Sequence, residues 1–165
     1  KLLELSFLDH PLLKLLAERA PGTYQHSLNV SRLGEAAAKE IGANPLLARV
    51  GSYYHDIGKI NKPEYFIENQ CLKEIERHKK LTPTMSSLVI IAHVKDGYEL
   101  ADQYKLGDDI KNIILEHHGT GLIYFFYKKA MEELEKFLIE NKTKFFKNLE
   151  ISRKKAIKDK TLKKI

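Results

Sequence analysis

Apolar side chains recur every three to four residues along most of the chain, and clusters of Pro, Gly and polar residues separate the stretches that show this pattern. A period near 3.6 indicates amphipathic helices. We therefore expect helices over residues 1–20 (with a break at 9–11), 24–41, 45–56, 82–104, 108–117 and 122–141, with a less regular helical stretch over 142–165. No stretch alternates with a sustained period of two, which predicts an all-α fold.

The boundaries of these helices carry typical capping and breaking residues. Asp9 and Thr23 are expected N-caps, and the pairs at 44–45 and 82–83 each place Pro after a capping residue. Gly58 is expected to end the third helix, followed by a loop over 59–63, a short turn over 64–69 and a polar mobile loop or lid over 70–81. The buried side of the 82–104 helix is predicted to comprise Met85, Leu88, Val89, Ala92 and Leu100.

The composition is that of a soluble domain with 43% hydrophobic and 30% charged residues. At 165 residues the chain can bury a sizeable core, and no apolar run reaches the roughly 18–20 residues of a membrane span. Because the chain opens on Lys1 in mid-pattern, we expect it to be a piece of a longer protein.

The net charge of +6 lies in the C-terminal part of the chain. Residues 128–165 hold 13 Lys and Arg against 6 Asp and Glu, whereas the preceding residues are nearly neutral. A basic tail can bind nucleic acid or an anionic membrane surface. It can equally be a solvated helix face, because Glu residues are interleaved with the Lys residues.

The candidate chemistry centres on the adjacent pair His55 and Asp56. A carboxylate can bridge two metal ions, whereas an imidazole gives one nitrogen to one ion. Four further histidines, on other predicted helices or at their ends, bring the candidate ligands to six: His26, His55, Asp56, His93, His117 and His118. The single Cys71 excludes a thiolate site, and an imidazole and carboxylate set suits Fe, Mn, Zn or Co. The alternative is that these are scattered surface or core histidines, as we expect for His10.

These residues and their surroundings resemble the HD-domain phosphohydrolases. Within that superfamily, five blocks in order are similar to the cytosolic domain of the seven-transmembrane HD receptors: Ala20–Ser27, Tyr53–Lys59, Phe66–Gln70, His93–Gly97 and His117–Thr120. The resemblance covers roughly residues 1–130. It implies an all-α HD-domain helical bundle and a single domain over 1–165, in which 131–165 form a divergent basic helical tail. It also implies that the chain comes from a longer membrane protein.

The resemblance further implies a phosphodiesterase that hydrolyses cyclic di-AMP to the linear dinucleotide pApA. Two divalent transition-metal ions, Fe or Mn, would be bound. His26 and His55 would hold the first and His93, His117 and His118 the second, with Asp56 bridging them. Lys59 would act with Asp56 in catalysis by pairing with a phosphate oxygen. Three further residues are assigned less directly: Thr120 would contact phosphate or cap a helix, and Tyr53 and Tyr54, with Tyr24, would stack on adenine or pack in the core.

The expected partner is thus a cyclic dinucleotide, with no DNA or RNA. The expected location is the cytoplasmic face of a bacterial membrane, reached through a segment outside this chain or weakly through the basic tail. The family completes its first metal site with a later Asp, for which Asp159 is a candidate and Glu132 or Glu133 are weaker ones. Two alternatives remain open, namely another HD nucleotide or alarmone phosphohydrolase, or a catalytically weak cyclic dinucleotide-binding module. The cyclic di-GMP branch is excluded, because no Gly-Tyr-Pro tripeptide occurs.

Overall fold

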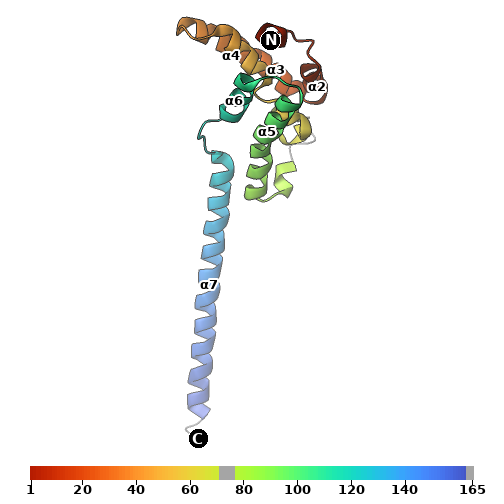
Figure 1. The fold of residues 1–165 in the computed structure, drawn as a ribbon. Coiled ribbons are helices and arrows are strands. Elements are labelled where there is room, and N and C mark those ends of the chain that lie inside the picture. The colour runs from red at the N-terminus through yellow and green to blue at the C-terminus, as the bar shows by residue number, and fades with distance from the viewer. Residues whose placement is uncertain (71–76, 163–165) are drawn as a thin grey trace. The chain divides into compact units, whose positions relative to one another are not determined.

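The structure is a computed structural model that describes the backbone of residues 1–70 and 77–162 and the side chains through residue 155. Every regular element in this part of the chain is helical, which confirms the predicted all-α fold (Figure 1). The α-helices are α1 (Leu2–Leu5), α2 (Pro11–Arg19), α3 (Pro21–Glu40), α4 (Pro45–Tyr54), α5 (Pro83–Gln103), α6 (Asp108–Glu116) and α7 (Tyr124–Leu162). Residues 1–122 and 123–165 form separate compact units; that the whole chain is one domain stays a prediction.

Four of the helices begin with Pro at their first position, where the missing N–H costs no hydrogen bond. The predicted caps Asn44 and Thr82 accept the amides of the residues three positions later, at 3.1 and 3.2 Å. The prediction for Asp9 was wrong, because His10 caps α2 by accepting the Leu12 amide on Nδ1 at 3.3 Å. Thr23 is not a cap either, since α3 begins two residues before it.

The hydrophobic core of the first unit lies where α2, α4 and α6 meet. Three of the four leucines of α2 are fully covered, and they pack with apolar residues of the other two helices and of the segment after α4: Leu12, Leu13, Leu16, Val50, Tyr54, Ile57, Ile110 and Ile114. α3 packs along α4 (Figure 1). This arrangement fixes the C-terminal end of α4, which carries His55 and Asp56.

The segment after α4 was predicted as a loop and a turn, but most of it is helical. It forms three short 3-10 helices, η1 (Ile57–Asn61), η2 (Pro63–Tyr65) and η3 (Ile67–Asn69), and a fourth, η4 (Arg77–Lys80), follows. Gly58 therefore does not end the helical path but lies inside η1. Of the predicted lid over 70–81, residues 71–76 lie outside the described residues.

The buried side of α5 differs from the predicted apolar face. Met85 and Leu88 are 49% and 56% exposed, whereas the covered positions are Pro83, Ser86, His93, Gly97 and Ala101. Small side chains are needed there because the backbone of η1 lies directly against α5. A Cβ added to Gly58 would lie 1.8 Å from the carbonyl oxygen of His93 and 2.5 Å from the amide nitrogen of Gly97. This close approach holds His93 beside the end of α4.

The second unit contains α7, which Figure 1 shows as one continuous helix. It extends well past residue 141, where the regular apolar pattern was expected to end. Leu134 and Phe137, which share that pattern, are exposed. None of the helices within residues 1–70 and 77–162 has the length and apolar content that a membrane span requires.

Candidate metal centre

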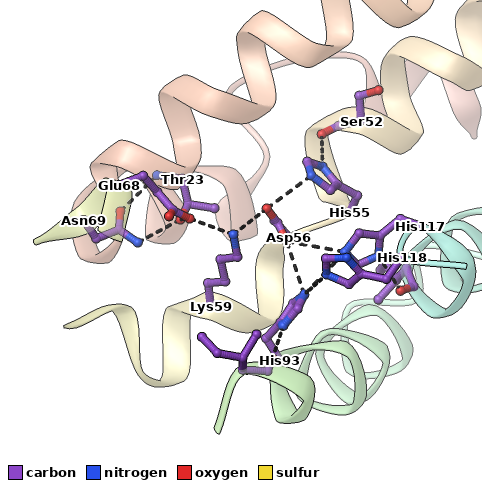
Figure 2. A network of polar contacts seen from close by, with 12 residues as sticks. Thr23, Ser52, His55, Asp56, Lys59, Glu68, Asn69, His93, His117 and His118 are labelled. Atoms are coloured by element: carbon purple, nitrogen blue, oxygen red, sulfur yellow. Dashed lines mark hydrogen bonds and ion pairs between the residues drawn. The ribbon is translucent and has the colours of Figure 1, made fainter. Parts of the chain in front are cut away.

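The carboxylate of Asp56 lies at the centre of the histidine cluster, as Figure 2 shows. Its side chain is buried, with 3% of the residue exposed. Oδ2 lies 3.2 Å from His55 Nε2 and 2.9 Å from Lys59 Nζ. Oδ1 faces the opposite way and lies 3.4 Å from His93 Nε2 and 3.6 Å from His117 Nε2. The two carboxylate oxygens therefore contact different groups of side chains.

Three of the histidines are oriented by backbone carbonyls of their own helices. His55 Nδ1 lies 2.8 Å from the carbonyl oxygen of Ser52, and His117 Nδ1 lies 2.8 Å from that of Ile114. His93 Nδ1 contacts the carbonyl oxygen of Ile90 in the same way. A carbonyl only accepts hydrogen bonds, so each Nδ1 carries the proton and each Nε2 presents a lone pair toward Asp56. This orientation by a backbone group is the usual arrangement for a metal-binding imidazole.

Without a cation, these inward-facing atoms would repel one another. His93 Nε2 lies 3.3 Å from His117 Nε2 and 3.1 Å from His118 Nε2. Among the described residues, the buried Oδ1 of Asp56 has no hydrogen-bond partner. A buried ionised oxygen without a donor is costly, and a divalent cation satisfies both the oxygen and the nitrogen lone pairs. The donor set therefore fits a metal ion.

All six predicted ligands come together in two groups that share Asp56. The first consists of His26, His55 and Asp56, and the second of Asp56, His93, His117 and His118. Within each group the ligand atoms lie within 4.8 Å of one another. The second group has four ligands, of which Asp56 and His93 are buried and His118 is exposed, whereas the first has three, of which Asp56 is buried and His26 is exposed. This geometry brings the predicted ligands together; their role in metal binding stays a prediction.

The charges of the cluster suit cation binding. Burial would raise the pKa of the Asp56 carboxyl. Without a metal ion, His117, His55 and His93 in their imidazolium forms can also donate from Nε2 to this carboxylate, and these hydrogen bonds outweigh burial and hold the pKa far below its usual range. Burial, together with the neighbouring rings of His117 and His93, lowers the pKa of His118 to about 4. Asp56 is therefore ionised and His118 neutral at pH 7, the forms in which both can bind a metal.

Lys59 reaches the same centre and is itself held by two carboxylates. Nζ lies 2.9 Å from Asp56 Oδ2 and donates to Glu68 Oε1 at 2.6 Å, and it lies 4.8 Å from the centroid of the Phe66 ring. Burial would lower the pKa of Lys59, but the negative charges of Asp56 and Glu68 raise it, so the ammonium stays protonated. Glu68 was not predicted as a site residue, and its only signal in the sequence was its place in the block Phe66–Gln70.

A cavity of about 570 Å³ opens beside the cluster. Its lining combines polar and apolar side chains: His26, Val30, Ala48, Ser52, His55, Asp56, Lys59, Ile113, His117 and His118. Such a mixture suits a ligand that carries both a phosphate and an apolar ring. Lys59 is thus placed where its ammonium can meet a phosphate that enters the cavity.

Other predicted substrate contacts do not converge on this cavity. Tyr54 has no exposed surface, and its hydroxyl donates to the Leu5 carbonyl at 3.1 Å, so the assignment of Tyr54 to substrate binding is corrected to a core role. Tyr53 and Tyr24 are partly buried against the core and are not among the lining residues. Thr120 is exposed in the turn after the His pair, and its contact with phosphate stays a prediction.

The candidates for a seventh ligand lie in the second unit. Glu132 and Glu133 are exposed residues of α7. Asp159 also lies within α7, but its side chain is outside the described residues. That any of these three carboxylates completes the group of His26, His55 and Asp56 stays a prediction.

Proteins of known function and known structure are similar to most of this chain. The chain is 50% identical over 133 residues to "Cyclic-di-AMP phosphodiesterase PgpH" of Bacillus subtilis (strain 168), covering 81% of this chain but 19% of that protein. It thus spans about a fifth of the length of the curated relatives it matches. Crystal structures of the L. monocytogenes phosphodiesterase PgpH HD domain are 51% identical with a TM-score of 0.72. One covers 75% of this chain and 59% of the solved chain. The other, a complex with cyclic-di-AMP, covers 76% and 58%.

The HD domain family matches residues 23–157 of this chain, a range that includes all six candidate ligands. The match also extends beyond residue 130, where the block-by-block resemblance ends, and into α7. The chain belongs to the HD domain family.

Proposed function

We propose that this chain is a dimetal phosphodiesterase that hydrolyses cyclic di-AMP to the linear dinucleotide pApA. The observation that carries the proposal is the position of Asp56, whose carboxylate is shared by two groups of histidines. The half-identical relative named as a cyclic-di-AMP phosphodiesterase, and the HD domain solved with cyclic-di-AMP, support this choice of substrate. The predicted location at the cytoplasmic face of a bacterial membrane stays a prediction.

In this proposal the two groups of ligands hold one metal ion each. Ions of this kind supply Lewis acidity toward water and toward a phosphoryl oxygen. Asp56 would be a ligand of both ions, and the carbonyl contacts of His55, His93 and His117 keep each Nε2 aimed at the centre. The set of imidazoles with one carboxylate suits Fe, Mn, Zn or Co, and the family resemblance favours Fe or Mn among these.

The remaining residues of the cavity would bind and orient the substrate. The Lys59 ammonium can donate to a non-bridging phosphate oxygen, since it lines the cavity and two carboxylates hold it in place. The apolar wall formed by Val30, Ala48 and Ile113 offers a surface for a base or ribose. Positioning of this kind lowers the barrier because the reacting groups are already aligned.

One observation favours a second candidate function. The group of His26, His55 and Asp56 has three ligands, whereas the other group has four. A weakly held first ion would leave a protein that binds the cyclic dinucleotide but turns it over slowly. The two candidates differ in rate rather than in ligand.

The test is turnover and binding measured side by side. The purified chain, reconstituted with Mn²⁺, is incubated with cyclic di-AMP, and the formation of pApA is followed by chromatography while calorimetry gives the affinity. We expect multiple turnovers with wild type and none with Asp56→Asn, which keeps the shape of the side chain but removes its charge. Binding without turnover in the wild type would favour the binding module, and neither binding nor turnover would refute both. Single-stranded RNA serves as the control substrate and should remain intact.

A further inference from the structure

A chain of hydrogen bonds connects the start of α3 to the metal centre (Figure 2). Asn69 Nδ2 donates to Thr23 Oγ1 at 2.8 Å, and Thr23 Oγ1 donates to Glu68 Oε1 at 3.1 Å. The same Oε1 accepts Lys59 Nζ at 2.6 Å, and Lys59 Nζ lies 2.9 Å from Asp56 Oδ2. Glu68 is therefore the link between a structural contact and a candidate metal ligand.

Glu68 is held in place by its surroundings. The Thr23 amide donates to Asn69 Oδ1 at 2.9 Å, so the Thr23 and Asn69 pair is joined twice, and Thr23 is fully buried. The backbones also touch, because a Cβ added to Gly22 would lie 1.8 Å from the carbonyl oxygen of Glu68. Only glycine permits this approach of η3 to the first turn of α3. The Glu68 carboxylate thus has a position set by the fold.

The second carboxylate changes what Lys59 does to Asp56. If Lys59 had Asp56 as its only partner, the whole ammonium charge would oppose a divalent cation on that carboxylate. Electrostatic interactions of this kind are strong at such distances when water is largely excluded, and the Lys59 side chain is 13% exposed. With Glu68 at 2.6 Å and Asp56 at 2.9 Å, the ammonium is shared, and its shorter contact is the one with Glu68.

We propose that Glu68 is a positioning residue that draws the ammonium of Lys59 away from Asp56. It thereby frees Asp56 for a metal ion and keeps Lys59 at the cavity, where an anionic ligand enters. The part of this inference that concerns phosphate rests on the proposed function. The part that concerns the metal does not, since it depends only on the charges around Asp56.

Glu68→Asp tests the inference without changing the net charge. The shorter side chain moves the carboxylate away from Lys59 by the length of one methylene, so Asp56 becomes the main ion-pair partner of the ammonium. We expect the Kd for Mn²⁺, measured by calorimetry without nucleotide, to rise about tenfold, which corresponds to about 1.4 kcal/mol. Glu64→Asp is the matched control: Glu64 lies in the neighbouring η2, and its ion pair is with Arg77 rather than with Lys59. Its Kd should stay within about twofold of wild type.

Glu68→Asp is then made in two chains that lack the Lys59 ammonium, Lys59→Met and Lys59→Gln. Two replacements are used so that the measurement can be made even if one of them does not fold. If Glu68 acts through Lys59, Glu68→Asp has no further effect on the Kd there. An equal rise of the Kd in both backgrounds, accompanied by an equal fall in Tm, would mean that Glu68 only supports the fold. If Glu68→Asp leaves the Kd for Mn²⁺ unchanged in the chain that keeps Lys59, the inference is also overturned. Since no nucleotide is present, these outcomes are independent of whether cyclic di-AMP is the substrate.

Discussion

Replacing Gly58 with Ala should damage the fold and the metal centre together. The ideal Cβ would lie 1.8 Å from the carbonyl oxygen of His93, whereas real Cβ atoms essentially never approach a heavy atom closer than 3.0 Å. The contacting atoms belong to the backbone, so no side-chain rotation relieves the overlap. η1 and α5 must separate by about 1.2 Å.

This separation can be compared with the tolerance of a metal site. His93 is carried by α5, and its Nε2 lies 3.4 Å from Asp56 Oδ1 in the same cluster. Metal–ligand distances are held within about 0.2 Å, so a shift of about 1.2 Å is several times too large. We expect the Kd for Mn²⁺ to rise by at least about tenfold. Overpacking of this kind should also cost about 3 kcal/mol of stability, which lowers Tm by roughly 6–12 °C.

Calorimetric titration with Mn²⁺ and thermal melting followed by circular dichroism measure the two effects. Gly34→Ala is the control, because its Cβ would meet the Ser52 hydroxyl at 3.3 Å rather than a backbone atom. That chain should keep its metal affinity, and its Tm should change little. A Gly58→Ala chain with the Tm and Mn²⁺ affinity of wild type would refute the reasoning.

Three further substitutions separate the roles of other residues. Asp56→Ala removes a ligand from both groups and should lower the rate of cyclic di-AMP hydrolysis by far more than tenfold; a rate above about a tenth of wild type, or about 1.4 kcal/mol, contradicts the bridging role. Tyr54→Phe loses the hydrogen bond to Leu5 and should cost about 1 kcal/mol of stability with no change in KM, whereas a rise in KM would restore its role in substrate binding. Burial, opposed in part by the charge of Asp9, lowers the pKa of His10 below its usual value of 6.5 in the folded chain. The unfolded chain therefore binds a proton at His10 more readily than the folded chain does, and the free energy of unfolding falls as the pH drops below about 6.5. His10→Asn can still accept the Leu12 amide but does not titrate, so its Tm should fall less from pH 7.5 to about pH 5.5; parallel curves would exclude His10 as the cause.

The sequence predicted which candidate ligands lie together better than it predicted the contacts that support them. His55, Asp56 and the pair His117 and His118 stand at helix ends, where the chain must turn, and such positions can be found from capping and breaking residues. The buried face of α5 could not be found in this way. Its closest contact is between Gly58 and the backbone of α5 at His93 and Gly97, and hydrophobic periodicity carries no signal for a place where side chains are absent.

Charged residues in short segments were the other source of error. Glu68 lies in a stretch without apolar periodicity, which the sequence predicted to be a short turn over 64–69. Its function becomes visible only when the fold brings Thr23 and Lys59 to it from positions 45 and 9 residues away. Tyr54 shows the converse case, because an aromatic residue beside a ligand has the same local signature whether it faces the cavity or the core.

The contacts of His55 and His117 with Ser52 and Ile114 have a consequence for helix ends. Each of these carbonyls belongs to the last turn of its helix, where backbone oxygens lack a partner within the helix. Each ring therefore donates from Nδ1 to a carbonyl at the C-terminus of α4 or α6 and points Nε2 toward Asp56. An alanine at either position would fray a helix as well as delete a ligand, so loss of activity alone would overstate the ligand's own contribution. The partial negative charge at these two helix ends also favours a bound cation, so the backbone adds to the attraction that Asp56 provides.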